Sequence, residues 1–361
     1  MNPRRILITG GAGFVGTNLA DHFISRGYHV SILDNFYRAG SRDNLRWLEG
    51  RYGDGFELIE ADIRDPGPLQ HACEGIDAVF HLAGQTAVTT SVADPRADFE
   101  INALGTFNVL EAARLSGRNP VLIFTSTNKV YGDLESVLYA ERSTRYAYSD
   151  NRNGIDESQP LDFHSPYGCS KGAADQYVRD YSRIYGLPTV VFRMSSIYGP
   201  HQFGVEDQAW VAHLVISAVT GKPINIYGDG KQVRDVLYVT DLARAFELVT
   251  ENIETTAGQV YNIGGGSNKA LSIWSEFAPL LSKRFSHSVE PSGFYDWRPG
   301  DQRIYISEIG KARRDFGWRP LVGVEAGLQG LSDWVLENQE IFRKSERHTR
   351  VASQATVAAA E

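Results

Sequence analysis

A tyrosine and a lysine lie four positions apart near the middle of the 361-residue sequence, in the string YGCSK that runs from Tyr167 to Lys171. Residues at this spacing lie on one face of a helix, where their side chains can meet. A free phenol has a pKa of about 10 and is a poor base at neutral pH, but neighbouring positive charge favours the phenolate. We expect two close positive charges, that of Lys171 and that of a bound cationic ligand, to bring the pKa of Tyr167 to about 7, so that the pair can take a proton from a hydroxyl group. A helical surface pair without a function is the alternative.

Other patterns in the sequence imitate catalytic motifs without the context that those motifs need. Tyr227 and Lys231 have the same spacing, but the Gly-Asp-Gly between them predicts a turn and not a helix. The string GCSKG matches the nucleophile elbow of serine hydrolases, which requires a strand directly before it, whereas the preceding His-Ser-Pro predicts the start of a helix. The nine histidines form no metal-ligand spacing, so we predict no metal site.

A glycine-rich segment near the start of the chain indicates a dinucleotide-binding loop. The string GGAGFVG, from Gly10 to Gly16, follows the first predicted strand and opens the first predicted helix. In this context the backbone can turn tightly at Gly10, approach a pyrophosphate at Gly13 and pack helix on strand at Gly16. The amide groups and the partial positive charge of the helix N-terminus then face the phosphates. A glycine-rich turn without a ligand is the alternative.

An acidic residue after the second predicted strand favours NAD over NADP as this dinucleotide. Asp34 lies 24 residues beyond Gly10, where a carboxylate can accept hydrogen bonds from ribose hydroxyls and would repel a 2′-phosphate. Arg38 and Arg42 follow closely, and an arginine there could instead accommodate the phosphate. Asp62, after the third predicted strand, could meet the adenine amino group or could be an ordinary loop residue.

Hydroxyl side chains follow the fifth predicted strand, in the string TSTNK from Thr125 to Lys129. Ligands of open parallel sheets lie at the carboxyl ends of the strands, so we expect these hydroxyls to face the cofactor. Thr127 is the candidate for a hydrogen bond to the reacting hydroxyl of the substrate. Serine and threonine residues that merely terminate a strand are the alternative.

Short apolar runs alternate with helical periodicity over much of the first 195 residues, which predicts a parallel sheet with helices on both faces. The predicted strands are residues 6–9, 29–33, 56–60, 78–82, 121–124 and 189–192, and the predicted helices are 17–26, 97–116 and 167–185. The expected fold class is therefore α/β, a Rossmann-type doubly wound parallel sheet with a smaller mixed α/β C-terminal lobe.

The chain divides into two expected domains and a tail. We place the dinucleotide domain at residues 1–195 and a substrate-binding lobe, interleaved with it, at 196–342. Within the first domain, residues 133–165 are polar and aromatic without a period, which predicts a long active-site loop. The segment 343–361 is rich in Ala, Ser and charged residues and lacks aromatic ones, which predicts a disordered tail.

Composition excludes several classes of protein. With 36 Lys and Arg against 44 Asp and Glu, the net charge of −8 disfavours nucleic acid as a partner. No apolar stretch reaches the roughly 20 residues of a membrane span, and the start of the chain has no apolar signal segment. Cys73 and Cys169 are too few for a disulfide framework. We therefore expect a soluble, cytoplasmic protein without a membrane partner.

With the glycine loop and the Tyr/Lys pair in this order, the sequence resembles the extended short-chain dehydrogenase/reductase superfamily, which contains sugar-nucleotide epimerases and dehydratases. The resemblance runs from residue 5 to residue 334 and covers nearly all of the chain outside the tail. It also rests on HLAG at 81–84, Asn102, VYG at 130–132, YGP at 198–200, RD at 234–235 with Asp241, RPGD at 298–301 and GWRP at 317–320.

This resemblance implies NAD, tightly bound and regenerated in each cycle, and a nucleotide-sugar substrate. It implies that Thr127, Tyr167 and Lys171 are catalytic, and that the chain forms a homo-oligomer, a dimer or a tetramer. The residues expected to bind the cofactor are Gly10, Gly13, Phe14, Val15, Gly16, Asp34, Asn35, Arg38, Asp62, Ile63, Leu82, Ala83, Gln85, Asn102, Thr125, Tyr167 and Lys171. Those expected to bind the substrate are Thr127, Asn128, Ser196, Gln208, Trp210, Arg234 and Arg298, with the two arginines on its diphosphate.

Three strings narrow the expected reaction: STNKVYGD at 126–133, LDFHSPYGCSKGAADQY at 161–177 and GKQVRDV at 230–236. They are most similar to enzymes that invert carbon 2 of a CDP-linked deoxyhexose through a transient keto-sugar. Dehydratases carry Asp-Glu where this chain has Asn128 and Lys129, so dehydration is disfavoured. Ser196 stands where many 4-epimerases have Asn, and Ala209 stands where close relatives usually have Gly. A 4-epimerase, a reductase of the same superfamily and a non-catalytic NAD sensor are the alternatives.

Overall fold

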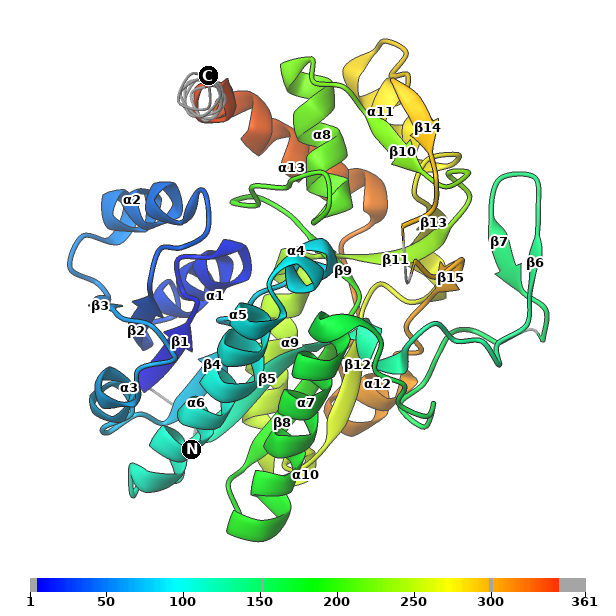
Figure 1. Ribbon diagram of the computed structural model, residues 1–361. Helices are drawn as coiled ribbons and strands as arrows, with labels where there is room; N and C mark the ends of the chain where they lie inside the picture. The colour runs from blue at the N-terminus through cyan, green and yellow to red at the C-terminus, as the bar shows by residue number, and fades with distance from the viewer. Residues whose placement is uncertain (1–4, 151, 299–300, 344–361) are drawn as a thin grey trace, which may run out of the picture.

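The computed structural model describes residues 5–150, 152–298 and 301–343. Its centre is a sheet of seven parallel strands in the order β3-β2-β1-β4-β5-β8-β12 (Figure 1). These strands are β1 (Arg5–Thr9), β2 (His29–Asp34), β3 (Glu57–Glu60), β4 (Ala78–His81), β5 (Val121–Thr127), β8 (Thr189–Met194) and β12 (Val260–Ile263). Strands are added first on one side of β1 and then on the other, which opens a ligand crevice at the carboxyl ends of β1 and β4. The Rossmann-type fold predicted from the sequence is confirmed.

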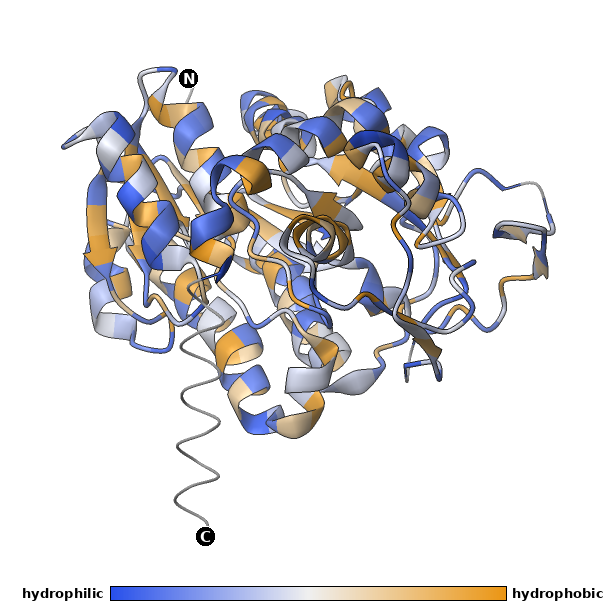
Figure 2. Ribbon diagram, turned by 90° about the horizontal axis from the view of Figure 1, so that it is seen from above, coloured by the Kyte–Doolittle hydropathy of each residue, from blue (hydrophilic) through white to orange (hydrophobic). Residues whose placement is uncertain are grey.

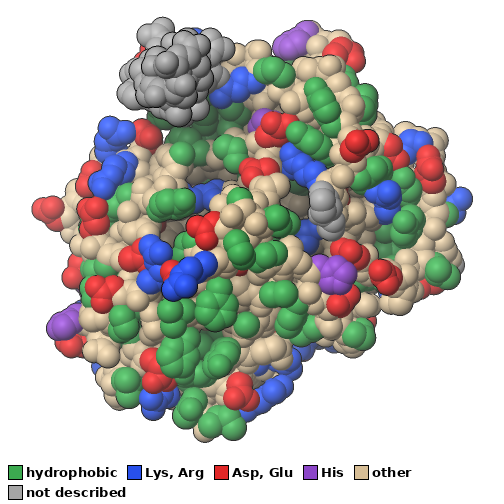
Figure 3. All heavy atoms as spheres, in the orientation of Figure 1, with side chains coloured by type: hydrophobic (Ala, Val, Ile, Leu, Met, Phe, Trp, Pro, Cys, Tyr) green, Lys and Arg blue, Asp and Glu red, His purple; other side chains and the backbone are tan. Residues whose placement is uncertain are grey.

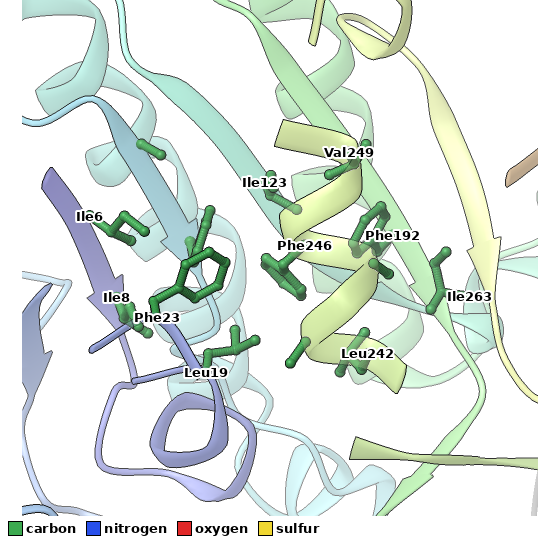
Figure 4. Packing of buried hydrophobic residues seen from close by; sticks show 14 of the residues in the cluster. Ile6, Ile8, Leu19, Phe23, Ile123, Phe192, Leu242, Phe246, Val249 and Ile263 are labelled. Carbon is green, nitrogen blue, oxygen red and sulfur yellow. The ribbon is translucent and has the colours of Figure 1, made fainter. Parts of the chain in front are cut away.

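Helices cover both faces of this sheet and enclose its apolar strands (Figures 1 and 2). One face packs against α1 (Phe14–Ile24), α2 (Ser41–Tyr52), α9 (Val239–Glu251) and α12 (Gly310–Phe316), and the other against α3 (Pro66–Ala72), α6 (Gly105–Leu115) and α7 (Ser165–Tyr185). On the first face, Phe23 of α1 and Phe246 of α9 approach the ring of Phe80 in β4 at 5.1 and 4.9 Å (Figure 4). Burial of each ring contributes roughly 1.5–3 kcal/mol, which fixes these helices on the sheet.

The single helix predicted at residues 97–116 is interrupted, and that prediction was wrong in this respect. The chain forms α4 (Val88–Ala93), α5 (Pro95–Phe99), a π-helical turn η1 (Glu100–Leu104) and then α6. Pro95 begins α5, and the Asp94 carboxylate caps it by accepting a hydrogen bond from the N–H of Ala97. The π-helical turn inserts one extra residue per turn, a feature that often occurs at functional sites. It places Asn102 in the interior, where 1% of its surface is exposed.

A second, smaller lobe lies beyond the carboxyl ends of the sheet (Figure 1). Its elements are β9 (Ser196–Tyr198), α8 (Trp210–Thr220), β10 (Asn225–Tyr227), β11 (Val233–Tyr238), η3 (Ser267–Lys269), β13 (Ala270–Ser272), α11 (Phe277–Phe285), β14 (Gly293–Tyr295), β15 (Ile304–Tyr305) and α13 (Val324–Glu337). The same stretch of sequence also supplies α9, α10 (Ile253–Thr256), β12 and α12. Because β12 pairs with β8 in the large sheet, the chain passes between the lobes several times after residue 196.

The segment 133–165 contains regular structure that its sequence does not indicate. Two short antiparallel strands, β6 (Tyr139–Glu141) and β7 (Tyr146–Tyr148), form a hairpin. The hairpin is held on the second lobe, because the N–H of Tyr146 donates to the carbonyl of Lys231 at 3.1 Å and Arg145 forms an ion pair with Glu276 at 2.5 Å. These partners are more than 80 residues away in the sequence, so local periodicity carries no signal of the hairpin.

Two predictions concern the ends of the chain and its membrane contacts. The predicted tail, 343–361, lies outside the described residues except for Arg343. Among the helices of residues 5–150, 152–298 and 301–343, none combines the length and the apolar character needed to cross a bilayer.

Candidate active site

The predicted proton-transfer residues meet where β5 ends and α7 begins. Thr127 is the last residue of β5, and Tyr167 lies in the first turn of α7, whose start is set by Pro166. Only 8% and 7% of the surfaces of Thr127 and Tyr167 are exposed. The N–H of Tyr167 donates to the hydroxyl of Ser91 at 3.1 Å, which joins this turn to α4. Burial raises the pKa of Tyr167 to about 12, and a hydrogen bond with the Thr127 side chain lowers it in part.

Lys171 lies one turn further along α7, with 5% of its surface exposed. Its Nζ donates to the carbonyl oxygen of Thr125 at 2.6 Å and stands 4.1 Å from the centroid of the Phe124 ring. Burial lowers the pKa of Lys171 to about 7, while the charges of Asp175 and Asp98 raise it. The ammonium is therefore held by the backbone of β5 in an apolar setting.

In the chain without a bound nicotinamide, the pKa of Tyr167 is raised, whereas the lowered value expected from the sequence depends on the nicotinamide charge as well as on Lys171. Desolvation acts on both members of the pair, making the phenolate harder to form and the ammonium harder to keep. Burial is the largest effect on the pKa of each group. The sequence pattern shows the spacing of a phenol and an amine but not how dry their site is.

Behind the pair, buried polar side chains connect three elements. Asp98 of α5 accepts hydrogen bonds from Ser170 of α7 at 2.5 Å, from Gln85 at 3.1 Å and from Asn102 of η1 at 3.1 Å. The N–H of Gln85 donates in turn to Asn102 at 3.0 Å. Asn102 and Gln85 were predicted to bind the cofactor, but Asp98 was missed, because no local motif marks it and only the fold brings it near Lys171.

The glycine loop has the shape that a dinucleotide requires. Gly10 has a φ of 70°, and a Cβ there would lie 2.7 Å from the backbone nitrogen of Ala83. A Cβ at Gly16 would lie 2.3 Å from the carbonyl oxygen of Gly10. Gly13 is the N-cap of α1, so the free amide groups of the first helical turn follow it directly. These bare backbone positions fit a bound pyrophosphate.

Asp34 ends β2 beside this loop and is held by backbone donors. Its Oδ2 accepts from the N–H of Ala12 at 3.0 Å, and its Oδ1 accepts from the N–H of Phe36 at 2.8 Å. Burial raises the pKa of this carboxyl group and the backbone hydrogen bonds lower it. Next to it, Asn35 donates to Asp62 at 2.8 Å, so these predicted cofactor residues lie together.

The remaining predicted cofactor residues lie along the same edge of the sheet, with one exception. Phe14 and Val15 begin α1, Ile63 follows β3, Leu82 and Ala83 follow β4, and Thr125 belongs to β5. The guanidinium of Arg38 instead contacts Gln208 of the second lobe and Thr86, which lies between β4 and α4. Because Gln208 was predicted to bind the substrate, the expected cofactor and substrate residues meet at this contact.

A cavity of about 490 Å³ opens between the two lobes. Four of the predicted substrate residues line it: Gln208, Trp210, Arg234 and Arg298. Thr127, Asn128 and Ser196 are not part of this lining. The hydroxyl of Ser196 accepts a hydrogen bond from the Trp210 indole at 3.1 Å, and Asn128 donates to Gln302 at 3.3 Å. The cavity nevertheless adjoins the catalytic candidates, because the N–H of Lys129, a lining residue, donates to the Thr127 hydroxyl at 3.2 Å.

Cationic side chains line this cavity together with carboxylates. Arg234 forms an ion pair with Asp301 at 2.6 Å, and Arg298 lies 3.9 Å from the centroid of the Tyr227 ring. Lys129, which was not among the predicted substrate residues, also lines it, and burial lowers the pKa of this lysine to about 8. The cavity can therefore attract an anionic ligand while its arginines are oriented by neighbouring groups. Across the described ranges, no cluster of three His, Cys, Asp or Glu side chains suits a metal ion.

These parts suit one class of chemistry. A buried phenol and hydroxyl stand beside a buried amine, at the sheet edge that carries the glycine loop. A phenol in this position can exchange a proton with a substrate hydroxyl while hydride moves to or from the dinucleotide. The adjoining cavity supplies arginines for an anionic group on that substrate.

Comparisons with known proteins agree with this arrangement. The family model described as "NAD dependent epimerase/dehydratase family" matches residues 6–264. CDP-paratose 2-epimerase of Salmonella typhi is 44% identical over 342 residues, which cover 91% of this chain and 98% of that protein. A dTDP-glucose 4,6-dehydratase of Neisseria meningitidis serogroup B is 34% identical, covering 93% of this chain and 94% of that protein.

Solved structures show the same relationship. DesIV, a dTDP-glucose 4,6-dehydratase from Streptomyces venezuelae with NAD and TYD bound, superposes with a TM-score of 0.79 at 30% identity, over 93% of this chain and 98% of that one. UDP-glucose 4-epimerase of Thermotoga maritima with UDP-glucose superposes with a TM-score of 0.78 at 30% identity, over 94% and 99%. Fold, loop and site thus agree with sequence similarity along nearly the whole chain, and the protein belongs to the NAD dependent epimerase/dehydratase family of enzymes.

Proposed function

We propose that the protein epimerises carbon 2 of a CDP-linked deoxyhexose, as its relative CDP-paratose 2-epimerase does by name. The observation that carries this proposal is the 44% identity to that enzyme over 91% of the chain. Two features of the site support it. The buried Thr127, Tyr167 and Lys171 provide proton transfer, and Asn128 with Lys129 replaces the acidic pair on which the dehydratases of the superfamily rely.

In this proposal Tyr167 acts as the general base and acid. When bound, NAD supplies the reversible hydride acceptor and a positive charge that favours the phenolate. Tyr167 accepts the proton of the sugar hydroxyl, and Thr127 donates a hydrogen bond to the same oxygen as it becomes a ketone. Tyr167 then returns the proton to complete the inverted alcohol. Proton transfer of this kind contributes roughly 10²–10⁴-fold to the rate, and the positioning of the sugar supplies further acceleration.

Inversion requires that the keto-sugar present its other face before the hydride returns. The diphosphate must stay anchored while the sugar turns, and Arg234 and Arg298 are the groups that would hold it. Both arginines line the cavity, and Arg298 donates to the carbonyl oxygen of Glu206 at 3.0 Å, which fixes its direction. Lys129 adds a third cation at the end nearest Thr127. These local charges offset a net charge of −8 over the whole chain.

The cofactor is proposed to remain bound through the cycle, since each hydride removed is returned. Gly10, Gly13 and Gly16 would hold its pyrophosphate at the start of α1. Asp34 would accept the adenosine ribose hydroxyls, which favours NAD over NADP. The backbone donors on Asp34 keep its carboxylate oriented toward the loop.

The test is to incubate the protein with CDP-paratose, CDP-glucose, UDP-glucose and dTDP-glucose and to follow each sugar by proton NMR. We expect inversion at carbon 2 of the CDP-deoxyhexose, with no net accumulation of NADH. Tyr167→Phe should abolish the turnover, whereas Tyr185→Phe, at the exposed far end of the same helix, should retain it. Inversion at carbon 4, or net reduction of the sugar, would establish one of the alternative enzymes instead. NAD binding without turnover of any nucleotide sugar would support a sensor.

We also propose that the protein is a homodimer formed through α5, α6 and α7. Hydrophobic side chains gather over these helices (Figure 3). The exposed ones include Phe99, Phe107, Leu115, Tyr177 and Ile184, of which Phe99 and Ile184 expose 58% and 66% of their surface. A large exposed apolar face on a monomer marks an interaction site. Light scattering after size-exclusion chromatography should give twice the monomer mass for the wild type. The Phe107→Glu variant should give the mass of a single monomer.

A reducing, cytoplasmic location is part of the same proposal. Cys73 and Cys169 are both free cysteines, and Cys169 is exposed. An exposed thiol persists where the environment is reducing. Fractionation of the producing cells should therefore recover the protein with cytoplasmic markers, and recovery with an oxidising compartment would contradict this location.

A further inference from the structure

A fully buried carboxylate lies behind the candidate catalytic helix. Asp98, on the short helix α5, has 1% of its surface exposed. Its Oδ2 accepts from the Ser170 hydroxyl at 2.5 Å, and its Oδ1 accepts from the amide groups of Gln85 and Asn102, both at 3.1 Å. These three donors belong to α7, to the loop after β4 and to η1. Asp98 is therefore the point at which three site-forming elements are connected.

All three donors to Asp98 are neutral, so its negative charge is not cancelled by them. The other carboxylate that acts on Lys171 is Asp175, one turn along α7. Asp175 is already paired with Arg193 of β8 at 2.9 Å, and these two side chains are 0% and 2% exposed. On the side of β4, His81 is buried at the same site, and burial lowers its pKa to about 3, so that it is neutral at physiological pH. Among the described residues, Asp98, unlike Asp175, therefore accepts hydrogen bonds only from neutral donors and is not paired with an arginine.

We propose that Asp98 is a positioning residue for the catalytic pair: its hydrogen bond from Ser170 fixes the Ser170–Lys171 turn of α7 against the Gln85 loop, and its charge, held beside this turn, favours the ammonium form of Lys171. Asp98 acts through Ser170 and Lys171 and does not touch the substrate. This role rests on the proposed function, since it concerns the residues to which that function assigns proton transfer. Burial disfavours the ammonium of Lys171, and the charge of Asp98 acts in the opposite direction.

The charge of Asp98 has a second effect, on the phenol. It raises the pKa of Lys171 and also raises the pKa of Tyr167. A rate profile that needs a phenolate and an ammonium is bell-shaped, and its two limbs are set together by the pKa values of Tyr167 and Lys171. Removing the charge of Asp98 lowers both values. The whole profile should therefore move toward acid, whereas loss of structure alone would reduce its height without moving it.

The variant Asp98→Asn tests this role with little change of shape. The oxygen of the new Asn side chain can still accept hydrogen bonds from the amides of Gln85 and Asn102, and its NH₂ group can donate to the hydroxyl of Ser170. That hydroxyl can still donate to the carbonyl oxygen of Tyr167, which lies 3.2 Å away. We expect both limbs of the kcat/KM profile to shift toward acid by about one pH unit, the effect of a unit charge in a partly dry site. Glu100→Gln is the matched control, because it removes a carboxylate of the same segment that pairs with Arg96 at the surface. Its profile should stay in place.

A second measurement keeps the role of Asp98 separate from the proposed function. In the NAD-loaded protein, the ionisation of Tyr167 is followed by the ultraviolet absorbance of the phenolate, with the Tyr167→Phe protein as the blank. Asp98→Asn should shift this titration toward acid even if no CDP-sugar is turned over. A folded Asp98→Asn protein, judged by circular dichroism and NAD retention, whose profile and phenolate titration stay at the wild-type pH would overturn the proposal. If Asp98→Asn does not fold, Ser170→Ala provides the test, because it leaves the charge of Asp98 in place and removes one of its hydrogen-bond donors. For the proposal to stand, Ser170→Ala must lower the rate without shifting the pH profile toward acid.

Discussion

The ammonium of Lys171 donates a hydrogen bond of 2.6 Å to the carbonyl oxygen of Thr125, two residues before the candidate catalytic Thr127. This bond joins α7 to the end of β5, so the strand backbone determines where the cation lies. The Phe124 ring, 4.1 Å from the same nitrogen, offers its negative face to the charge. Burial lowers the pKa of Lys171 to about 7, which makes this amine responsive to pH in the physiological range.

Replacing Lys171 by Met should remove most of the activity while preserving the packing of the long side chain. Without the cation, the phenolate of Tyr167 loses its nearby stabilising charge, and we expect kcat/KM to fall by about 10²-fold or more. Steady-state kinetics on the NAD-loaded enzyme measure this. Lys231→Met is the matched control, since Lys231 has the same spacing from a tyrosine but forms its ion pair with Glu141 on the hairpin. Equal losses in the two variants would contradict a specific role for Lys171.

The stability of the fold should depend on pH through the same lysine. Its pKa is about 7 when folded against an ordinary value of 10.5, so between these values the unfolded chain binds the proton that the folded chain has lost. Stability from this group therefore rises as the pH rises through that window and is lowest below it. Lys171→Met has no such proton. Between about pH 7 and pH 9, the thermal midpoint of the wild type should rise relative to that of Lys171→Met. A difference in midpoint that stays constant over this range would contradict the burial of a charge.

The fold was largely predictable because most strands of the large sheet, although not β3, are buried runs of apolar residues. The observed bounds of β2, β4 and β8 differ from the predicted ones by no more than two residues at either end. The catalytic candidates were predictable for a related reason, since Tyr167 and Lys171 are close in the sequence and the glycine loop has a local signature. Asp98 and Lys129 were missed, because what places them at the site is long-range packing against α7 and the second lobe.

Electrostatic properties and irregular backbone could not be predicted in the same way. The pKa of Tyr167 depends on how much water reaches it, and burial is a property of the assembled fold. The π-helical turn that orients Asn102 has no sequence signature of its own within a helical pattern. The hairpin at β6 and β7 depends on contacts with Lys231 and Glu276, which follow it by more than 80 residues.

Ala209 occupies a backbone conformation that suits glycine better than alanine. Its φ is 62°, in the left-handed region, where a Cβ costs roughly 1–2 kcal/mol. Ala209→Gly should therefore raise the free energy of unfolding by about 0.5–1 kcal/mol, after the larger entropy of the unfolded glycine chain is deducted. Ala218→Gly, in the last turn of α8, makes the same chemical change in a helical residue and should lower it by about 0.5–1 kcal/mol. Urea unfolding of the two variants measures both, and effects of the same sign would contradict the strain at Ala209.

The buried pair of Asp175 and Arg193 should be the most sensitive ion pair in the described part of the molecule. Two guanidinium nitrogens of Arg193 donate to the carboxylate at 2.9 Å each, and the hydroxyl of Ser126, beside Thr127, donates to it as well at 2.9 Å. Removing one partner leaves an uncompensated charge in a dry interior, which costs about 3–5 kcal/mol. A partly exposed pair such as Arg114 and Glu111, with side chains 33% and 28% exposed, contributes about 1 kcal/mol or less.

Arg193→Met should therefore lower the free energy of unfolding by about 3–5 kcal/mol, against about 1 kcal/mol or less for Arg114→Ala. Adding Asp175→Leu to Arg193→Met should restore part of the loss, because the second change removes the stranded carboxylate. Chemical unfolding of the single and double variants gives the coupling between the two residues directly. If the losses of the two single variants simply add in the double variant, the two charges act independently. In that case Asp175 would not be neutralised by Arg193, and its charge could act on Lys171 instead. The turnover of the double variant adds a second readout, since Ser126 loses its acceptor next to Thr127 and the end of β5 is no longer tied to α7 at that point.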